Sequence, residues 1–189
     1  VVLQNNDVSE QSVYPWHYGG GVYIGGSKQL TMEDGAEITN CTARSGGAVL
    51  ANGTFTMNGG TIKNNQAVLS KSDNRSGYGG GVVVLTNNGT MVMNGGLITE
   101  NQAASGGGGI AQPYADNNTL SIHGGTISNN TAKRCGGGIY VECNNKALID
   151  GNQTSVNIIG NHADGDTRAF AGGGIYVNGG RSGYANGEV

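Results

Sequence analysis

Short stretches of alternating apolar and polar residues, separated by glycine-rich turns, run through most of the chain. In the clearest example, Val82-Val83-Val84 directly follows three consecutive glycines. This alternation is typical of half-buried β-strands, and the 3.6-residue periodicity of amphipathic helices is absent. A glycine-led first strand is therefore expected at residues 22–24, 49–51, 82–84, 110–112, 139–141 and 175–177.

Each glycine-led strand opens a unit that holds two further elements. A second alternating strand is expected at residues 30–32, 55–57, 91–93, 120–122 and 147–149. A third element has the pattern Ile-x-x-Asn-x-Ala and occupies residues 38–43 (with Cys41 in the Asn place), 62–67, 98–103, 127–132 and 158–163. The glycines that open successive units are 27, 33, 28, 29 and 36 residues apart. Such self-similarity indicates a repeat architecture in which each unit packs on its neighbours.

Three strands per unit in a fixed order predict an all-β, right-handed parallel β-helix, a solenoid with three short strands per coil and about six coils. Each strand then lies parallel to its copy in the next coil, about 4.8 Å away. Two structural ladders follow from this stacking, because stacked apolar groups fill the core and stacked Asn amides bond adjacent turns. Their members are Ile38, Ile62, Ile98, Ile127 and Ile158, and Asn65, Asn101, Asn130 and Asn161. Glycines fit the corners, where the backbone needs a positive φ or a close approach.

One β-helix domain is expected over residues 1–189, as a fragment of a longer repeat protein. Residues 1–17 are interpreted as part of a preceding coil and a loop, residues 18–177 as the main coils, and residues 178–189 as a tail. Variable insertions at 68–78, 113–119, 153–157 and 164–171 fall between strands. Insertions in repeat proteins form surface loops that are often on the binding side.

Composition excludes several classes of partner. The formal net charge is −3, only 12% of residues are charged, and no run of Lys or Arg occurs, so no nucleic-acid partner is expected. No apolar stretch approaches the roughly 18 residues that cross a bilayer, so no membrane insertion of this segment is expected. Cys41, Cys135 and Cys143 lack paired spacing, which argues against a disulfide framework or a zinc site and leaves the redox compartment open.

Two stretches carry a family resemblance. Residues 53–67 (GTFTMNGGTIKNNQA), followed by 79–84 (GGGVVV), and residues 118–141 resemble the repeats of bacterial surface β-helix proteins. These include large cell-wall proteins of gut bacteria and the polymorphic outer-membrane-protein repeats of autotransported adhesins. The resemblance implies a glycine-rich adhesin or structural stalk, secreted or at the cell surface. Its expected partners are host or microbial surface proteins or glycans and the flanking domains of the same protein.

The same fold also includes polysaccharide lyases and glycoside hydrolases, so a carbohydrate-active or glycan-binding module remains the alternative. Outward positions of the first and second strands carry no titratable pair for acid–base chemistry. A polar column after the second strand has its carboxylates at opposite ends and is expected to be a solvated turn: Glu33, Asn58, Asn94, His123 and Asp150. No catalytic residue and no cofactor is therefore expected, and the chain is predicted not to be an enzyme.

The candidate contact surface is an outward stripe along the first strands. Tyr23, Tyr140 and Tyr176 are expected to lie on it, with Tyr78 and Tyr114 extending it from corners or loops. Exposed aromatic residues stack on sugars or bind proteins, although they are also common on strands without any such role. The stripe is completed by Leu50, Val83 and Ala111.

The polar loop at residues 161–168 is a weak candidate metal site. Asp164 and Asp166 are spaced as in sites for hard cations, with Gly165 between them. The pattern lacks the bidentate Glu of a calcium loop, and an ordinary exposed loop is the alternative reading. Calcium is the cation that this spacing favours.

Overall fold

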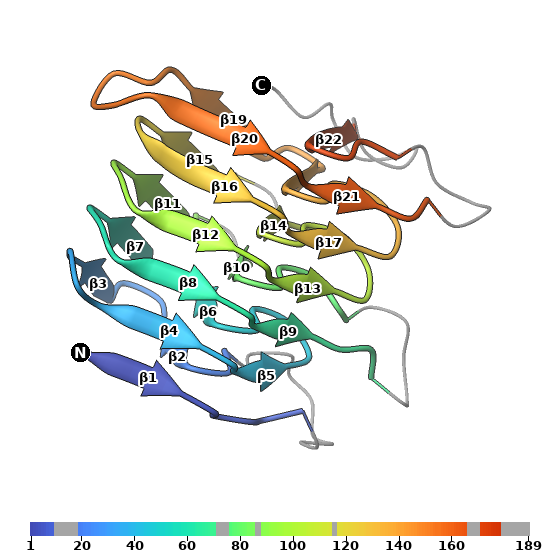
Figure 1. Cartoon of the computed structure of the whole chain (residues 1–189), viewed down its shortest axis with the longest axis horizontal. Coiled ribbons are helices and arrows are strands. Elements are labelled where there is room, and N and C mark those ends of the chain that lie inside the picture. Colours follow the sequence, from blue (N-terminus) through green and yellow to red (C-terminus); the bar gives the residue numbers. More distant parts are fainter. Residues whose placement is uncertain (10–18, 71–75, 86–87, 115–116, 166–170, 179–189) are drawn as a thin grey trace.

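The computed structural model describes residues 1–9, 19–70, 76–85, 88–114, 117–165 and 171–178. Within these residues the chain winds through four parallel sheets, one strand of each per coil, and the coils stack along one axis (Figure 1). No helix long and apolar enough to cross a membrane occurs in the described ranges. The stacking of the parallel sheets confirms the expected solenoid and its coil count. The residues at 10–17 and most of the expected tail, 179–189, lie outside the described ranges.

The four sheets are numbered here in the order in which a coil visits them. Sheet 1 contains β2 (Val22–Ile24), β6 (Val49–Ala51), β10 (Val82–Val84), β14 (Ile110–Gln112), β18 (Ile139–Glu142) and β22 (Ile175–Asn178). Sheet 2 contains β3 (Gln29–Met32), β7 (Thr54–Met57), β11 (Thr90–Met93), β15 (Thr119–Ile122) and β19 (Lys146–Ile149). Sheet 3 contains β1 (Val2–Gln4), β4 (Glu37–Thr39), β8 (Thr61–Lys63), β12 (Leu97–Thr99), β16 (Gly125–Ser128) and β20 (Val156–Ile159). Sheet 4 contains β5 (Thr42–Ala43), β9 (Gln66–Ala67), β13 (Gln102–Ala103), β17 (Thr131–Ala132) and β21 (His162–Ala163).

A coil has four strands instead of the expected three, because the third element is divided in two. The residue before the Asn place adopts a left-handed conformation in every coil, as Asn64 (φ 57°) and Glu100 (φ 55°) show. This conformation ends the strand of sheet 3 and turns the chain into the short strand of sheet 4. Asn is tolerated there, whereas other non-glycine residues such as Glu are strained.

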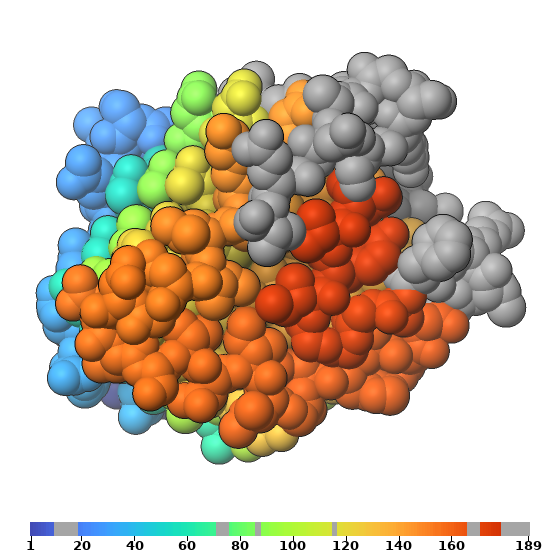
Figure 2. Space-filling view, turned by 90° about the horizontal axis from the view of Figure 1, so that it is seen from above, coloured from blue at the N-terminus to red at the C-terminus, as the bar shows by residue number. Residues whose placement is uncertain are grey.

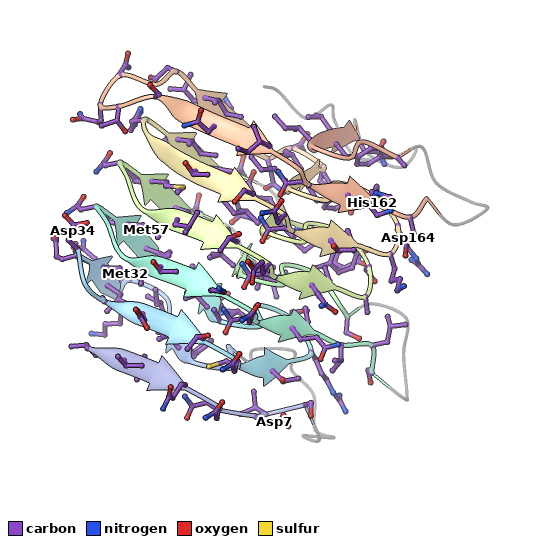
Figure 3. All side chains as sticks on the ribbon, in the orientation of Figure 1. Asp7, Met32, Asp34, Met57, His162 and Asp164 are labelled. Atoms are coloured by element: carbon purple, nitrogen blue, oxygen red, sulfur yellow. The ribbon has the colours of Figure 1, made fainter. Side chains whose placement is uncertain are left out.

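The core is a stack of like side chains, as predicted. In sheet 3, Ile38, Ile62, Ile98, Ile127 and Ile158 occupy equivalent registers. Sheet 2 contributes the larger inward groups, and Met32 and Met57 extend inward from its first two strands (Figure 3). Ile158 is only partly buried because β20 is an edge strand, and Figure 2 shows the face of the stack formed by β19 to β22.

The corner glycines have the two roles that the sequence suggests. Gly107, the first of its triplet, has a φ of 69°, which few other residues adopt. Gly108 follows it, and a Cβ there would lie 2.3 Å from the carbonyl oxygen of Gly137 in the next coil. A side chain at this second position would therefore separate neighbouring coils.

The predicted Asn ladder is present and runs through the interior. Asn65 Nδ2 donates to Asn101 Oδ1 at 2.9 Å, Asn101 Nδ2 donates to Asn130 Oδ1 at 3.0 Å, and Asn130 Nδ2 donates to Asn161 Oδ1 at 3.0 Å. Each Oδ1 also accepts the backbone N–H of the preceding Asn. The ladder ends at Cys41, whose backbone N–H donates to Asn65 Oδ1 at 2.9 Å. Cys41, Cys135 and Cys143 are all buried, and none of them forms a disulfide.

One inward position breaks the apolar stack. Gln112 lies in register with Val141 of the next coil and is completely buried, yet within the described part of the chain neither polar atom of its amide has a hydrogen-bond partner. An unsatisfied buried amide costs free energy that an apolar side chain does not. The substitution Gln112→Val is therefore expected to raise the free energy of unfolding by about 1–2 kcal/mol.

Urea denaturation followed by circular dichroism measures this gain. The matched control is Gln66→Val on the exposed face of β9, which is expected to change stability by no more than about 0.5 kcal/mol. A Gln112→Val protein that is less stable than the parent would show that the amide has a stabilising partner.

Candidate functional site

The outer face of sheet 1 is covered, which corrects the expectation of an exposed stripe. Leu50, Val83 and Ala111 do point outward but are completely buried in a second apolar cluster outside the solenoid core. Tyr78 and Cys135, each directly before a glycine triplet, belong to this cluster. These turn residues lack the alternation of a strand, so the sequence pattern does not reveal that they pack against the sheet.

Four of the five predicted contact tyrosines gather on this face, and they are called the tyrosine cluster below: Tyr78, Tyr114, Tyr140 and Tyr176. The ring centroids of Tyr78 and Tyr140 are 5.4 Å apart, and those of Tyr140 and Tyr176 are 5.5 Å apart with nearly parallel planes. Tyr114 meets Tyr78 edge to face at 5.1 Å, and its hydroxyl donates to that of Tyr78 at 2.8 Å. These separations are favourable for aromatic pairs.

The tyrosines differ in exposure. Tyr78 and Tyr140 are only 6% and 4% exposed, so the expectation that they lie on the surface is wrong. Tyr114 and Tyr176 are half-buried at the edge of the cluster. Tyr23 is 50% exposed on β2, an edge strand of sheet 1, and its hydroxyl accepts a hydrogen bond from Asn52 Nδ2 at 3.3 Å. Ligand contact by these residues stays a prediction.

A carboxylate lies beside the tyrosine cluster. Glu142 is the last residue of β18 and is only 6% exposed, and its Oε2 has no hydrogen-bond partner among the described residues. Burial raises the pKa of Tyr140 far above its ordinary value, and the negative charge of Glu142 and a hydrogen bond to it raise that pKa further. Burial also raises the pKa of Tyr78. The hydroxyls of Tyr78 and Tyr140 therefore stay neutral at physiological pH.

The polar column after the second strand forms side-chain hydrogen bonds between coils. Asn58 Nδ2 donates to Glu33 Oε1 at 2.8 Å, and Asn94 Nδ2 donates to Asn58 Oδ1 at 2.9 Å. At the other end, His123 Nδ1 lies 2.8 Å from Asp150 Oδ1 and lowers the pKa of Asp150 through this hydrogen bond. Glu33 follows β3 and Asp150 follows β19, the two edge strands of sheet 2, so these two carboxylates are separated as predicted.

The candidate calcium loop has other electrostatic partners. Asp164 Oδ2 accepts a hydrogen bond from Lys133 Nζ at 2.9 Å, and Asp164 Oδ1 lies 3.1 Å from His162 Nε2. Figure 3 shows His162 and Asp164 extending together beside β21. The hydrogen bond and charge of Lys133 hold the pKa of Asp164 below its usual value. Asp166 lies outside the described residues, and the described ranges contain no group of three metal-ligating side chains.

The outer side of sheet 4 carries a polar groove that the strand pattern did not predict. A cavity of about 280 Å³ is lined by Asn64, Gln66, Glu100 and Gln102, together with the ladder residue Asn65. A second cavity of about 220 Å³ shares Gln66 and Gln102 and extends to Thr131 and Lys133. Since Gln66, Gln102 and Thr131 are in register on successive strands, the two cavities form one groove along the solenoid axis. Each unit has a polar residue between the Asn and Ala places of its Ile-x-x-Asn-x-Ala pattern, and this repeated polar position is the signal that could have predicted the groove.

A third cavity, of about 390 Å³, lies at the β1 end of the stack. Its apolar lining comes from Leu3, Val22 and Leu30, which belong to the first strands of sheets 3, 1 and 2. Glu33 and Glu37 also line it. The cavity is therefore the end of the solenoid interior, bordered by acidic turn residues.

Comparison with known proteins agrees with this architecture. A family model described as a right-handed β-helix region matches residues 1–186. Neither curated proteins nor solved structures gave a match. Proteins of the family include both enzymes and proteins without enzymatic activity. Because the match spans almost the whole chain and the parallel sheets have the corresponding topology, this chain belongs to the right-handed β-helix family.

Proposed function

We propose that this chain is a segment of a secreted or cell-surface bacterial protein and acts as an adhesin stalk that holds a binding surface in a fixed position. The observation that carries the proposal is the uninterrupted, in-register stacking of coils in all four sheets. Main-chain ladders and the interior Asn ladder connect every pair of neighbouring coils between Cys41 and Asn161. A stack connected in this way resists bending and shear, as a stalk requires.

Two groups of charged residues, the polar column after the second strands and the corner beside β21, support a binding surface over a hydrolytic site. A glycoside hydrolase needs two carboxylates about 5–10 Å apart on either side of the scissile bond. In the polar column the carboxylates are on opposite edge strands, and in the corner beside β21 the carboxylate of Asp164 is paired with Lys133. These arrangements favour binding of a ligand without its chemical conversion.

Binding to arrays of surface proteins and glycans, with and without calcium, tests this function. We expect saturable binding that neither releases products nor depends on calcium. The variant Asp164→Asn should bind as the parent does, because the carboxylate already has protein partners. Release of cleaved oligosaccharides from acidic polysaccharides would overturn the stalk proposal in favour of a lyase or hydrolase.

The groove on sheet 4 favours a second candidate, a glycan-binding module without enzymatic activity. Amide side chains donate to and accept from sugar hydroxyls, and the register repeats them at about 4.8 Å along the groove. The double variant Gln66→Ala/Gln102→Ala is expected to weaken binding to a glycan identified on the array by about tenfold, for two lost hydrogen bonds.

Isothermal titration calorimetry measures this loss. The matched control is Asn58→Ala in the polar column on sheet 2, which removes an amide of the same kind from a different face. Equal weakening by the control and by the double variant would exclude the groove as the binding site.

A further inference from the structure

We propose that the outer face of sheet 1 carries a binding site for an organic ammonium group, formed by Glu142 and the tyrosine cluster. This site is separate from the groove on sheet 4 that the glycan-binding candidate uses. The proposal depends on the buried carboxylate, on the aromatic rings beside it, and on the partial exposure of two of those rings.

One oxygen of the buried Glu142 carboxylate lacks a hydrogen-bond partner among the described residues. Glu142 is 6% exposed and its Oε2 accepts no hydrogen bond. A buried carboxylate oxygen without a partner is costly, and a cation beside it removes most of that cost. Arg134 is near enough to influence the pKa of Tyr78, but it has contacts of its own and leaves Oε2 without a partner. A cationic ligand would supply a partner for this oxygen.

The aromatic rings provide the second half of an ammonium site. Tyr140 stacks on Tyr176 with centroids 5.5 Å apart and meets Tyr78 at a tilt with centroids 5.4 Å apart, and Tyr114 meets Tyr78 edge to face at 5.1 Å. Ring faces attract ammonium groups within about 6 Å of the centroid, and the attraction increases when the cation is shielded from water. Together, rings and carboxylate select a bulky, weakly hydrated cation.

The same features argue against other small ligands. A carboxylate repels anions, so phosphates, sulfates and acidic sugars are disfavoured. The hydroxyls of Tyr114 and Tyr78 hydrogen bond to each other, and the Tyr140 hydroxyl bonds Glu142, which leaves few donors for a neutral sugar. Tyr114 and Tyr176 are half-buried, so the cluster has a partly exposed edge that an ammonium group can approach.

Choline and its uncharged isostere 3,3-dimethyl-1-butanol test the proposal, because they differ in charge and hardly in shape. Titration followed by NMR should show saturable binding of choline and at least tenfold weaker binding of the alcohol. The variant Glu142→Gln keeps the shape of the side chain and should weaken choline binding at least tenfold. Asp150→Asn, which alters a carboxylate outside the cluster, should leave choline binding unchanged.

A second variant keeps the test independent of how Glu142→Gln folds. Tyr176→Leu acts at the half-buried edge of the cluster and should weaken choline binding several-fold while the circular dichroism spectrum is retained. Absence of choline binding to the parent protein, equal affinity for the alcohol, or full affinity in a folded Glu142→Gln protein would each overturn the ammonium site. None of these outcomes bears on the stalk or on the groove, because both use other surfaces.

Discussion

The substitution Ile127→Asp is expected to lower the free energy of unfolding by about 4 kcal/mol or more. Ile127 is completely buried on β16 and stacks between Ile98 and Ile158 in the adjacent coils. An aspartate there places a carboxylate among isoleucines with no cation or donor to satisfy it. Because each coil is stabilised by its neighbours, several coils should unfold together.

Chemical denaturation monitored by circular dichroism measures the effect, and hydrogen exchange shows how many coils open. The matched control is Thr126→Asp, one residue earlier on the same strand and on the outward face, with an expected loss below about 1 kcal/mol. Similar losses for the two variants would mean that the inward and outward assignments of sheet 3 are incorrect.

The substitution Asn101→Leu is expected to cost about 3 kcal/mol or more, despite adding apolar volume to a buried position. Asn101 Oδ1 accepts from both the backbone N–H and Nδ2 of Asn65, and Asn101 Nδ2 donates to the carbonyl oxygen of Ile62 and to Asn130 Oδ1. Leucine removes all four bonds and leaves buried groups in two neighbouring coils without partners.

Asn58→Leu is the matched control for the ladder. Asn58 also hydrogen bonds to the coils on either side of it, but these bonds are exposed, and water replaces them when they are lost. Its expected cost is below about 1 kcal/mol. Thermal unfolding of the two variants, measured in parallel, tests whether the interior amide ladder contributes more to stability than the exposed column because it is buried.

Strand alternation and the glycine triplets were sufficient to predict the solenoid, the Ile ladder and the Asn ladder. These features repeat with the same residue types, so they are visible in the sequence. The fourth strand was not predicted, because the left-handed residue that creates it varies among coils, from Asn64 to Glu100 and Gly160. A backbone conformation shared by such different residues leaves no consistent pattern.

The candidate sites were less predictable than the fold. Alternation correctly placed Tyr140 on the outward face of sheet 1, but outward did not mean exposed, since Tyr78 and Cys135 cover part of that face. The position of Glu142 beside the tyrosines depends on β18 continuing one residue beyond the shorter strands β6, β10 and β14. Such local extensions and covering turns are decided by tertiary contacts.

The variable segments between strands bear on how proteins of this kind can change in length. The insertion after β9 and the one after β21 fall between strands, and the register of the following strands is retained. Between Asn65 and Asn161 each coil presents to the next the same ladder amide and main-chain groups that it receives from the previous one. Duplication or loss of a whole coil there therefore keeps the same kind of contact between neighbours and changes the reach of the protein in steps of about 4.8 Å.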